Sequence, residues 1–141
     1  MRIYADSSFF VSLYITDQHS HIARTAVKSH PWFLLTPLHR AEWANAVARH
    51  VFLNLLTDSQ ARQIHTTFDR DCARGLWLQT DMPVTAFETC IEISRVYTQR
   101  LGTRTLDTLH VACALELGAE RFFTFDDRQK KLARAAGLKT A

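Results

Sequence analysis

The hydrophobic positions of the chain alternate between short runs, typical of strands, and longer segments with helical spacing. Strands are expected at residues 2–6, 32–35, 76–78 and 121–125, with a last short one at 138–139. Helices are expected at about residues 7–15, 18–29, 36–55, 57–75, 83–101, 105–117 and 126–137. Strands that alternate with helices pair in parallel. The expected fold is therefore α/β, a three-layer sandwich with helices on both faces of a short parallel sheet of about four to five strands.

Capping residues mark several of these helix ends. Thr36-Pro37 places a threonine at the N-cap and a proline at the first helical position, and His39 occupies the third position of a capping box. Thr105 is expected to cap the helix over 105–117, which Gly118 ends. The local sequence thus predicts where these helices begin and end.

Length and composition indicate one folded domain over residues 1–141, since 47% of the 141 residues are hydrophobic and can form an ordinary core. Apolar runs stay below the roughly 18 residues that cross a bilayer, and Asp6 interrupts the first of them. We therefore expect a soluble, cytoplasmic protein without membrane contact. Its three cysteines are widely spaced, which predicts buried, reduced thiols rather than a zinc site or disulfides.

The net charge of +3 is weak support for a polyanionic partner, but the charge is unevenly distributed. Residues 121–141 hold six basic and two acidic side chains, so the basic excess lies at the C-terminus. This segment could contact phosphates. A solvated helix face is the ordinary explanation, and charge alone favours it.

Two acids follow expected strands directly. Asp6 comes after residues 2–5 and Asp126 after residues 121–125. Each has an equally good structural explanation as the N-cap of the next helix, and Gln129 would give Asp126 a capping-box partner. In open parallel sheets, ligands bind beyond the carboxyl ends of the strands, which makes both acids candidates for a site.

Two further acids lie in early turns of expected helices. Glu42 is flanked by alanines and, taken alone, is best explained as a surface glutamate. Asp107 begins a helix that is apolar nearly all round and therefore buried, where an acid is costly unless it is paired or binds a metal. A functional role is favoured for Asp107.

The arrangement of the four acids is more informative than any one of them. The helices of βαβ units begin at the edge where the strands end, so Asp6, Glu42, Asp107 and Asp126 can converge on one crevice. Four carboxylates there would repel one another, and a hard divalent cation would relieve that repulsion. His110 lies in the buried helix and is interpreted as a hydrogen-bonded core residue.

Four segments, in this order and spacing, resemble PIN-domain proteins: "YADSS", "AEWANAV", "TLDTLHVACAL" and "FFTFDDRQKKLA". The likeness covers essentially the whole chain and is greatest to VapC-type toxins, the ribonuclease halves of toxin–antitoxin pairs. It implies a PIN-like sandwich and cleavage of single-stranded RNA by water activated on one or two Mg²⁺ or Mn²⁺ ions. It also implies an inhibitory antitoxin and a homodimer.

The resemblance also assigns site residues. Those implied as catalytic and metal-binding are Asp6, Glu42, Asp107 and Asp126; Ser8 and Thr124 would support them; and Arg104, Lys130, Lys131 and Arg134 would contact RNA. Asp127 could replace Asp126, although the match to "TFD" favours Asp126. Two other functions stay open, a PIN nuclease of RNA processing and a non-catalytic PIN-like module that binds RNA or protein. Phe9, Phe10 and Tyr14 are predicted to be core, with a dimer face as the alternative.

Overall fold

The computed structural model describes residues 1–30 and 32–141, which form two compact units. The first unit contains Met1–Asp6 and Asp81–Ala141, and the second contains Ser7–Thr80. The single domain expected over residues 1–141 stays a prediction. No helix in the described part of the chain has the length and apolar character needed to span a bilayer.

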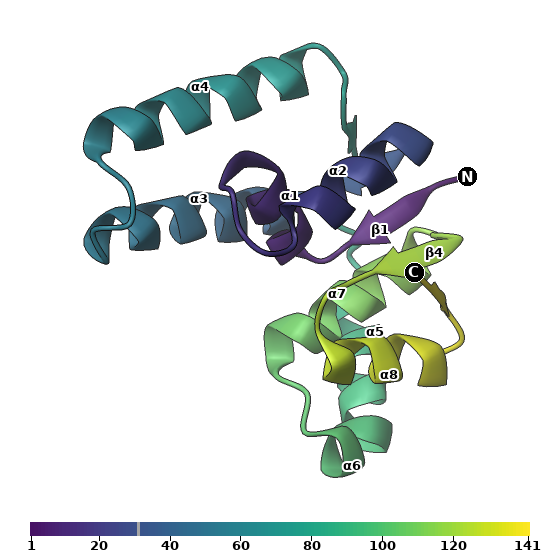
Figure 1. The fold of residues 1–141 in the computed structure, drawn as a ribbon. Coiled ribbons are helices and arrows are strands. Elements are labelled where there is room, and N and C mark those ends of the chain that lie inside the picture. The colour runs from purple at the N-terminus through teal and green to yellow at the C-terminus, as the bar shows by residue number, and fades with distance from the viewer. Residues whose placement is uncertain (31) are drawn as a thin grey trace. The chain divides into compact units, whose positions relative to one another are not determined.

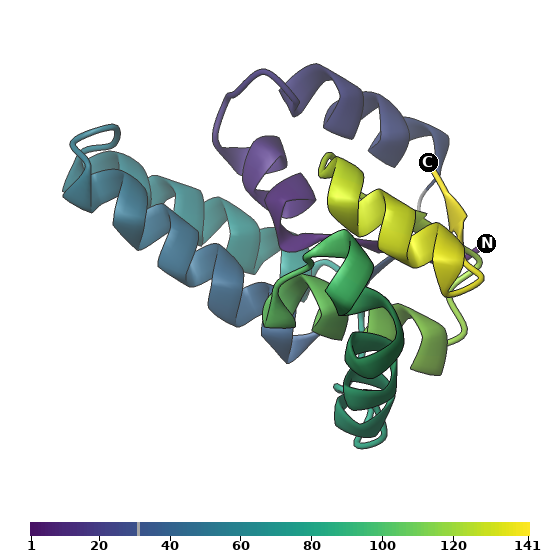
Figure 2. The same ribbon diagram turned by 90° about the horizontal axis from the view of Figure 1, so that it is seen from below.

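The first unit has three parallel strands with β4 in the middle (Figure 1). Ala5 pairs with Phe123 at one end of β1 and β4, and Arg121 pairs with Lys139 on the other side of β4. Its strands are β1 (Ile3–Ala5), β4 (Arg121–Phe123) and β5 (Lys139–Thr140). Its helices are α5 (Ala86–Ile93), the π-helix η1 (Ser94–Thr98), α6 (Gln99–Leu101), α7 (Thr105–Glu116) and α8 (Asp127–Ala135). Helix α8 packs on β4, β5 and α7 (Figure 2).

The second unit combines four helices with two parallel strands, in which Leu34 pairs with Leu78. Its elements are α1 (Ser7–Tyr14), α2 (Ser20–Ser29), β2 (Phe33–Leu35), α3 (Pro37–Phe52), α4 (Asp58–Ala73) and β3 (Leu78–Gln79). Helices α3 and α4 lie side by side (Figures 1 and 2). Both begin with capping boxes, at Thr36 with His39 and at Thr57 with Gln60. The predicted start of α3 is confirmed.

Two local predictions are wrong. The helix expected over 83–101 begins only at Ala86, and the π-helical turn Ser94–Thr98 interrupts it. Helix α7 has Arg104, not Thr105, as its N-cap, and no side chain caps it. Thr105 is instead the first helical residue, so the start of α7 depends on surrounding structure rather than on a local cap.

The core explains why α7 carries almost no amphipathic pattern. Every residue of α7 from Thr108 to Ala114 is buried, as its apolar sequence predicts. Phe9 and Phe10 are also fully buried, so they are core and do not form a dimer face.

All three cysteines are free and buried, and burial raises the pKa of Cys113 to about 11. The thiols are therefore protonated and inert near neutral pH.

Candidate functional site

Asp6 and Asp126 meet at the carboxyl edge of the first unit's strands, as the sequence predicts. Asp6 follows β1, and its backbone N–H donates to the carbonyl of Phe123 at the end of β4, at 2.9 Å. Asp126 is the N-cap of α8, and its Oδ1 accepts a hydrogen bond from the backbone N–H of Gln129 at 2.8 Å. The capping explanation is thus correct for Asp126, but it leaves the carboxylate at the mouth of the sheet.

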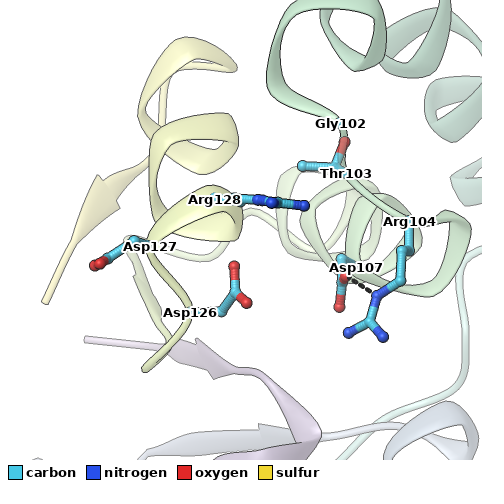
Figure 3. A pocket seen from close by; sticks show the side chains of 7 residues that line it. All are labelled: Gly102, Thr103, Arg104, Asp107, Asp126, Asp127 and Arg128. Carbon is cyan, nitrogen blue, oxygen red and sulfur yellow. Dashed lines mark hydrogen bonds and ion pairs between the residues drawn. The ribbon is translucent and has the colours of Figure 1, made fainter.

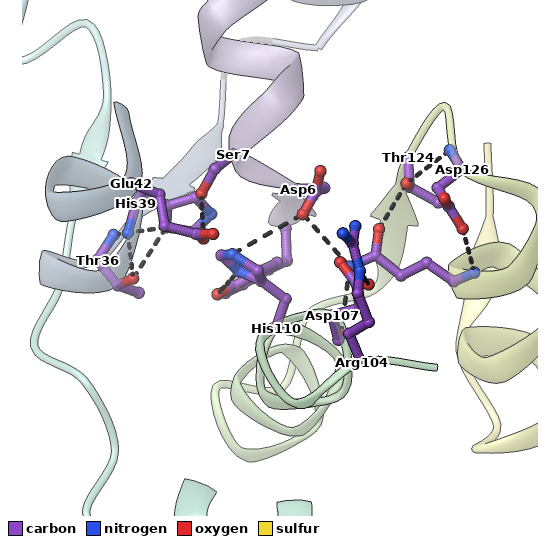
Figure 4. Close-up of polar contacts among 12 residues, drawn as sticks. Asp6, Ser7, Thr36, His39, Glu42, Arg104, Asp107, His110, Thr124 and Asp126 are labelled. Atoms are coloured by element: carbon purple, nitrogen blue, oxygen red, sulfur yellow. Dashed lines mark hydrogen bonds and ion pairs between the residues drawn. The ribbon is translucent and has the colours of Figure 1, made fainter. Parts of the chain in front are cut away.

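Asp107 lies in the first turn of α7 and forms an ion pair with Arg104, which precedes the helix (Figure 4). The Nε of Arg104 donates to Oδ2 of Asp107 at 3.1 Å. The Arg104 side chain is 84% exposed and that of Asp107 22%, so the pair lies at the surface of the site. The hydrogen bond to Asp107 raises the pKa of Arg104, and the charges of Asp126 and Asp6 add to the effect. The guanidinium therefore lies in the field of all three carboxylates.

Gln129 connects these three acidic segments. Its side-chain Nε2 donates to Oδ1 of Asp6 at 3.3 Å and to the backbone carbonyl of Asp107 at 3.2 Å. Its Oε1 accepts from the hydroxyl of Thr124 at 2.6 Å, and Thr124 Oγ1 in turn accepts from the backbone N–H of Asp126 at 3.1 Å. The capping box expected between Asp126 and Gln129 is therefore only half formed, since the glutamine side chain binds elsewhere.

A buried aromatic pair lies behind Asp6. The hydroxyl of Tyr4 and Nδ1 of His110 are hydrogen-bonded at 2.8 Å, and both side chains are 1% exposed or less. His110 Nε2 lies 3.8 Å from Oδ1 of Asp6 (Figure 4). The imidazole of His110 therefore bridges Tyr4 and Asp6, with Nδ1 toward the hydroxyl and Nε2 toward the carboxylate. The prediction that His110 is a hydrogen-bonded core residue is confirmed.

A pocket of about 400 Å³ opens beside Asp107 and Asp126 (Figure 3). It is lined by Gly102, Thr103, Arg104, Asp107, Asp126, Asp127 and Arg128. In Figure 3 the Asp126 carboxylate lies on the side of Asp107 and Arg104, whereas that of Asp127 points away from them. This arrangement agrees with the choice of Asp126 over Asp127. Asp127 is the first residue of α8, where an acid interacts favourably with the helix dipole.

Sequence reasoning missed Arg128, which reaches into this pocket (Figure 3). The basic residues proposed from the α8 sequence, Lys130, Lys131 and Arg134, are not among the lining residues. Arg134 instead donates from Nε to the hydroxyl of Thr140 at 2.7 Å. Residues 128 and 130 lie about 200° apart around an α-helix, so they point to opposite sides of it. Helical spacing could therefore have shown that Arg128 and Lys130 do not face the same site.

Glu42 and Ser8 belong to the second unit, in α3 and α1. Glu42 Oε1 accepts a hydrogen bond from the hydroxyl of Ser7 at 2.8 Å (Figure 4). Ser7 is 5% exposed, whereas Ser8 is exposed. Ser7, which sequence reasoning did not select, is therefore bonded to a candidate acid, and the supporting role of Ser8 stays a prediction.

The donor set of the first unit suits a hard divalent cation. Asp6, Asp107 and Asp126 offer carboxylate oxygens, the ligands that Mg²⁺ and Mn²⁺ prefer. Within residues 1–30 and 32–141, no three His, Cys, Asp or Glu side chains form a ready-made metal cluster. Arg104, His110 and Gln129 hold the carboxylates instead. The chemistry of the donors therefore fits a hard divalent cation.

The family model described as "PIN domain" matches residues 3–135. A search of curated proteins finds no match to the chain.

Solved structures share the fold at low sequence identity. The Mycobacterium tuberculosis toxin VapC20, described as cleaving the Sarcin-Ricin loop, is similar with a TM-score of 0.71 and 17% identity, over 96% of this chain and 95% of that one. FitAcB from Neisseria gonorrhoeae has a TM-score of 0.73 and 16% identity, over 98% of this chain and 95% of that one. VapBC2 from Rickettsia felis, bound to a DNA fragment from its promoter, has a TM-score of 0.68 and 14% identity. The match covers 100% of this chain and 98% of that one. The predicted α/β, PIN-like fold is confirmed.

Proposed function

Because this chain belongs to the PIN-domain family, we propose that it is a metal-dependent endoribonuclease that cuts single-stranded RNA, the toxin of a toxin–antitoxin pair. The observation that carries the proposal is the convergence of three aspartates from separate segments on one edge of the first unit. Two arginines line the same pocket and would complement a phosphodiester. The likeness to VapC20, described as a toxin that cleaves the Sarcin-Ricin loop, supports RNA as the substrate class.

In this proposal, Asp6, Asp107 and Asp126 of the first unit would hold one or two Mg²⁺ or Mn²⁺ ions. Glu42 belongs to the second unit, and its catalytic and metal-binding role stays a prediction from the family resemblance. Such an ion would supply Lewis-acid stabilisation of charge on the scissile phosphate and a water of lowered pKa. Arg104 has two roles, because it neutralises Asp107 in the structure and would bind a substrate phosphate once Asp107 ligates the ion. Thr124 keeps Asp126 in place, because its hydroxyl oxygen accepts a hydrogen bond from the backbone N–H of Asp126.

The test of the proposal is cleavage of a mixed single-stranded RNA pool by the purified chain. We expect cleavage with Mg²⁺ or Mn²⁺, loss of cleavage in EDTA, and recovery when excess metal is returned, since carboxylates alone would not stabilise the charge on phosphate. A folded protein that cuts nothing with either metal would contradict the proposal. That result would favour the non-catalytic binding module.

Arg128 is proposed to bind a phosphate of the RNA beside the cleaved bond, together with Arg104. We expect Arg128→Gln to weaken RNA binding by about tenfold, because a charge-assisted hydrogen bond contributes about 1.5 kcal/mol or more. The slope of log affinity against log salt should fall by about 0.7, the value for one phosphate contact on a single strand. Fluorescence anisotropy with labelled RNA in EDTA measures both quantities.

Arg134→Gln is the matched comparison for Arg128→Gln, since Arg134 lies on the same helix but is bonded to Thr140. We expect a smaller effect on affinity and salt slope. Equal effects of the two variants would contradict a specific role for Arg128 and would support the wider basic surface with Lys130 and Lys131.

We also propose two protein partners, an antitoxin and a second copy of this chain. A similar solved structure, described as a toxin–antitoxin complex from Klebsiella pneumoniae, is the ground for expecting a cognate antitoxin. A homodimer is supported by exposed apolar side chains on and beside α5, where Val84, Phe87 and Ile91 are 93%, 57% and 49% exposed. Apolar side chains clustered in this way are typical of protein interaction surfaces.

A further inference from the structure

Gln129 is unusual because a long polar side chain is buried at the centre of the first unit's acidic edge. Only 1% of it is exposed, and burying an amide is unfavourable unless its hydrogen bonds are replaced. Here both N–H groups and the carbonyl oxygen have partners, at 3.3, 3.2 and 2.6 Å. An apolar residue would fill the same space without this requirement. The amide therefore has a role beyond packing.

The partners of Gln129 fix the direction of its amide. Asp6 Oδ1 and the carbonyl of Asp107 can only accept, so the NH₂ group must face them and Oε1 must face Thr124. The hydroxyl of Thr124 accepts from the backbone of Asp126 and gives its one proton to Oε1. The glutamine thus has a single satisfactory orientation, with donors aimed at two of the acidic segments.

Each acidic segment of the first unit is anchored to this one residue. Asp6 is held through its carboxylate, Asp107 through its backbone carbonyl, and Asp126 through the backbone N–H of Gln129. Asp6 lies 123 positions from Gln129 in sequence, and Asp107 lies 22. Displacement of the glutamine side chain would therefore move Asp6 and Asp107 relative to Asp126, which stays bonded to the backbone.

We infer that Gln129 is a positioning residue that fixes the spacing of Asp6, Asp107 and Asp126 for a divalent cation. This inference rests on the proposed function. The side chain of Gln129 bonds to the Asp6 carboxylate, the Asp107 carbonyl and the Thr124 hydroxyl, so it acts through the acidic segments and not on the RNA. Partners that orient metal ligands typically change metal affinity by about 10–100-fold when they are removed.

The test is the affinity for Mn²⁺, measured by titration calorimetry without RNA. Gln129→Met keeps the length of the side chain and removes its side-chain hydrogen bonds, while the backbone N–H still binds Asp126. We expect it to weaken Mn²⁺ binding by about 10–100-fold. Leu132→Val is the matched control, because Leu132 is fully buried on the same helix and has no polar contact with the acids. It should lower the melting temperature and leave Mn²⁺ affinity unchanged.

The outcomes separate this inference from the proposed function. In one outcome the wild type binds Mn²⁺, Asp107→Asn does not, and folded Gln129→Met binds as tightly as the wild type. The positioning role is then wrong, and the nuclease proposal stands. If the wild type binds no Mn²⁺, both are wrong. If Gln129→Met does not fold, Gln129→Asn decides, because its amide keeps the polarity of the site but is too short to reach Asp6, the carbonyl of Asp107 and Thr124 together. A lower affinity then supports the inference, and an unchanged affinity overturns it.

Discussion

Asp107→Asn is expected to lower metal-dependent RNA cleavage by at least about 100-fold. The loss of a group that merely orients a ligand costs up to about that factor, and Asp107 is proposed as a ligand itself. The substitution keeps the shape of the side chain and removes the charge that would hold the cation. Initial rates on a fluorogenic single-stranded RNA at saturating Mn²⁺ measure the effect.

The stability of Asp107→Asn should be nearly that of the wild type. The ion pair with Arg104 is at the surface, since the Arg104 side chain is 84% exposed, and solvent-exposed pairs add little to stability. Loss of activity without loss of fold would therefore place Asp107 in the chemistry. An active Asp107→Asn variant would contradict the proposed site.

Asp127→Asn is the matched control, because it makes the same chemical change at a residue that lines the same pocket. We expect it to keep most of the activity, since its carboxylate points away from Asp107 and Arg104 (Figure 3). A loss as large as that of Asp107→Asn would show that Asp127 shares the role given to Asp126.

Trp43→Ala is expected to destabilise the second unit by roughly 3–5 kcal/mol, the usual cost of removing a large buried aromatic side chain. Trp43 is 1% exposed and stacks on Phe68 with the ring centroids 4.0 Å apart. His65 and Tyr14 contact it edge-on at 5.0 and 5.7 Å. Urea unfolding followed by circular dichroism measures the free energy of unfolding.

Trp43→Phe separates packing from hydrogen bonding at the same site. In the part of the chain that the structure describes, the buried indole Nε1 has no hydrogen-bond partner, so phenylalanine removes no hydrogen bond. We expect a loss of about 1–2 kcal/mol, because fewer buried atoms are removed. A loss equal to that of Trp43→Ala would mean that the indole N–H is bonded after all.

Much of the secondary structure follows from the sequence, because helix ends depend on contacts within a few residues. Thr36 and Thr57 each bond to the residue three positions on, and both predicted helix starts are confirmed. Gly118 and Gly137 follow α7 and α8 with positive φ, a conformation that glycine adopts without strain. The N-cap at Arg104 and the π-helical turn at Ser94–Thr98 were missed, since neither has a local hydrogen-bonding signal.

Part of the candidate site also follows from the sequence. The approach of Asp6 to Asp126 could be predicted because the carboxyl ends of parallel strands share an edge, and Ala5 does pair with Phe123. That argument uses only the order of strands and helices. It places acids at an edge, but it does not say which neighbouring side chains bind them.

Only the tertiary structure decided those partners. Gln129 looks like a capping-box residue for Asp126 by its spacing, yet its side chain bonds to Asp6, which is 123 positions away. Arg128 lines the pocket and Arg134 bonds to Thr140, although both are basic residues of one helix. Local spacing determines caps and helix faces, whereas the choice among polar partners depends on which segments the packed core brings within hydrogen-bonding distance.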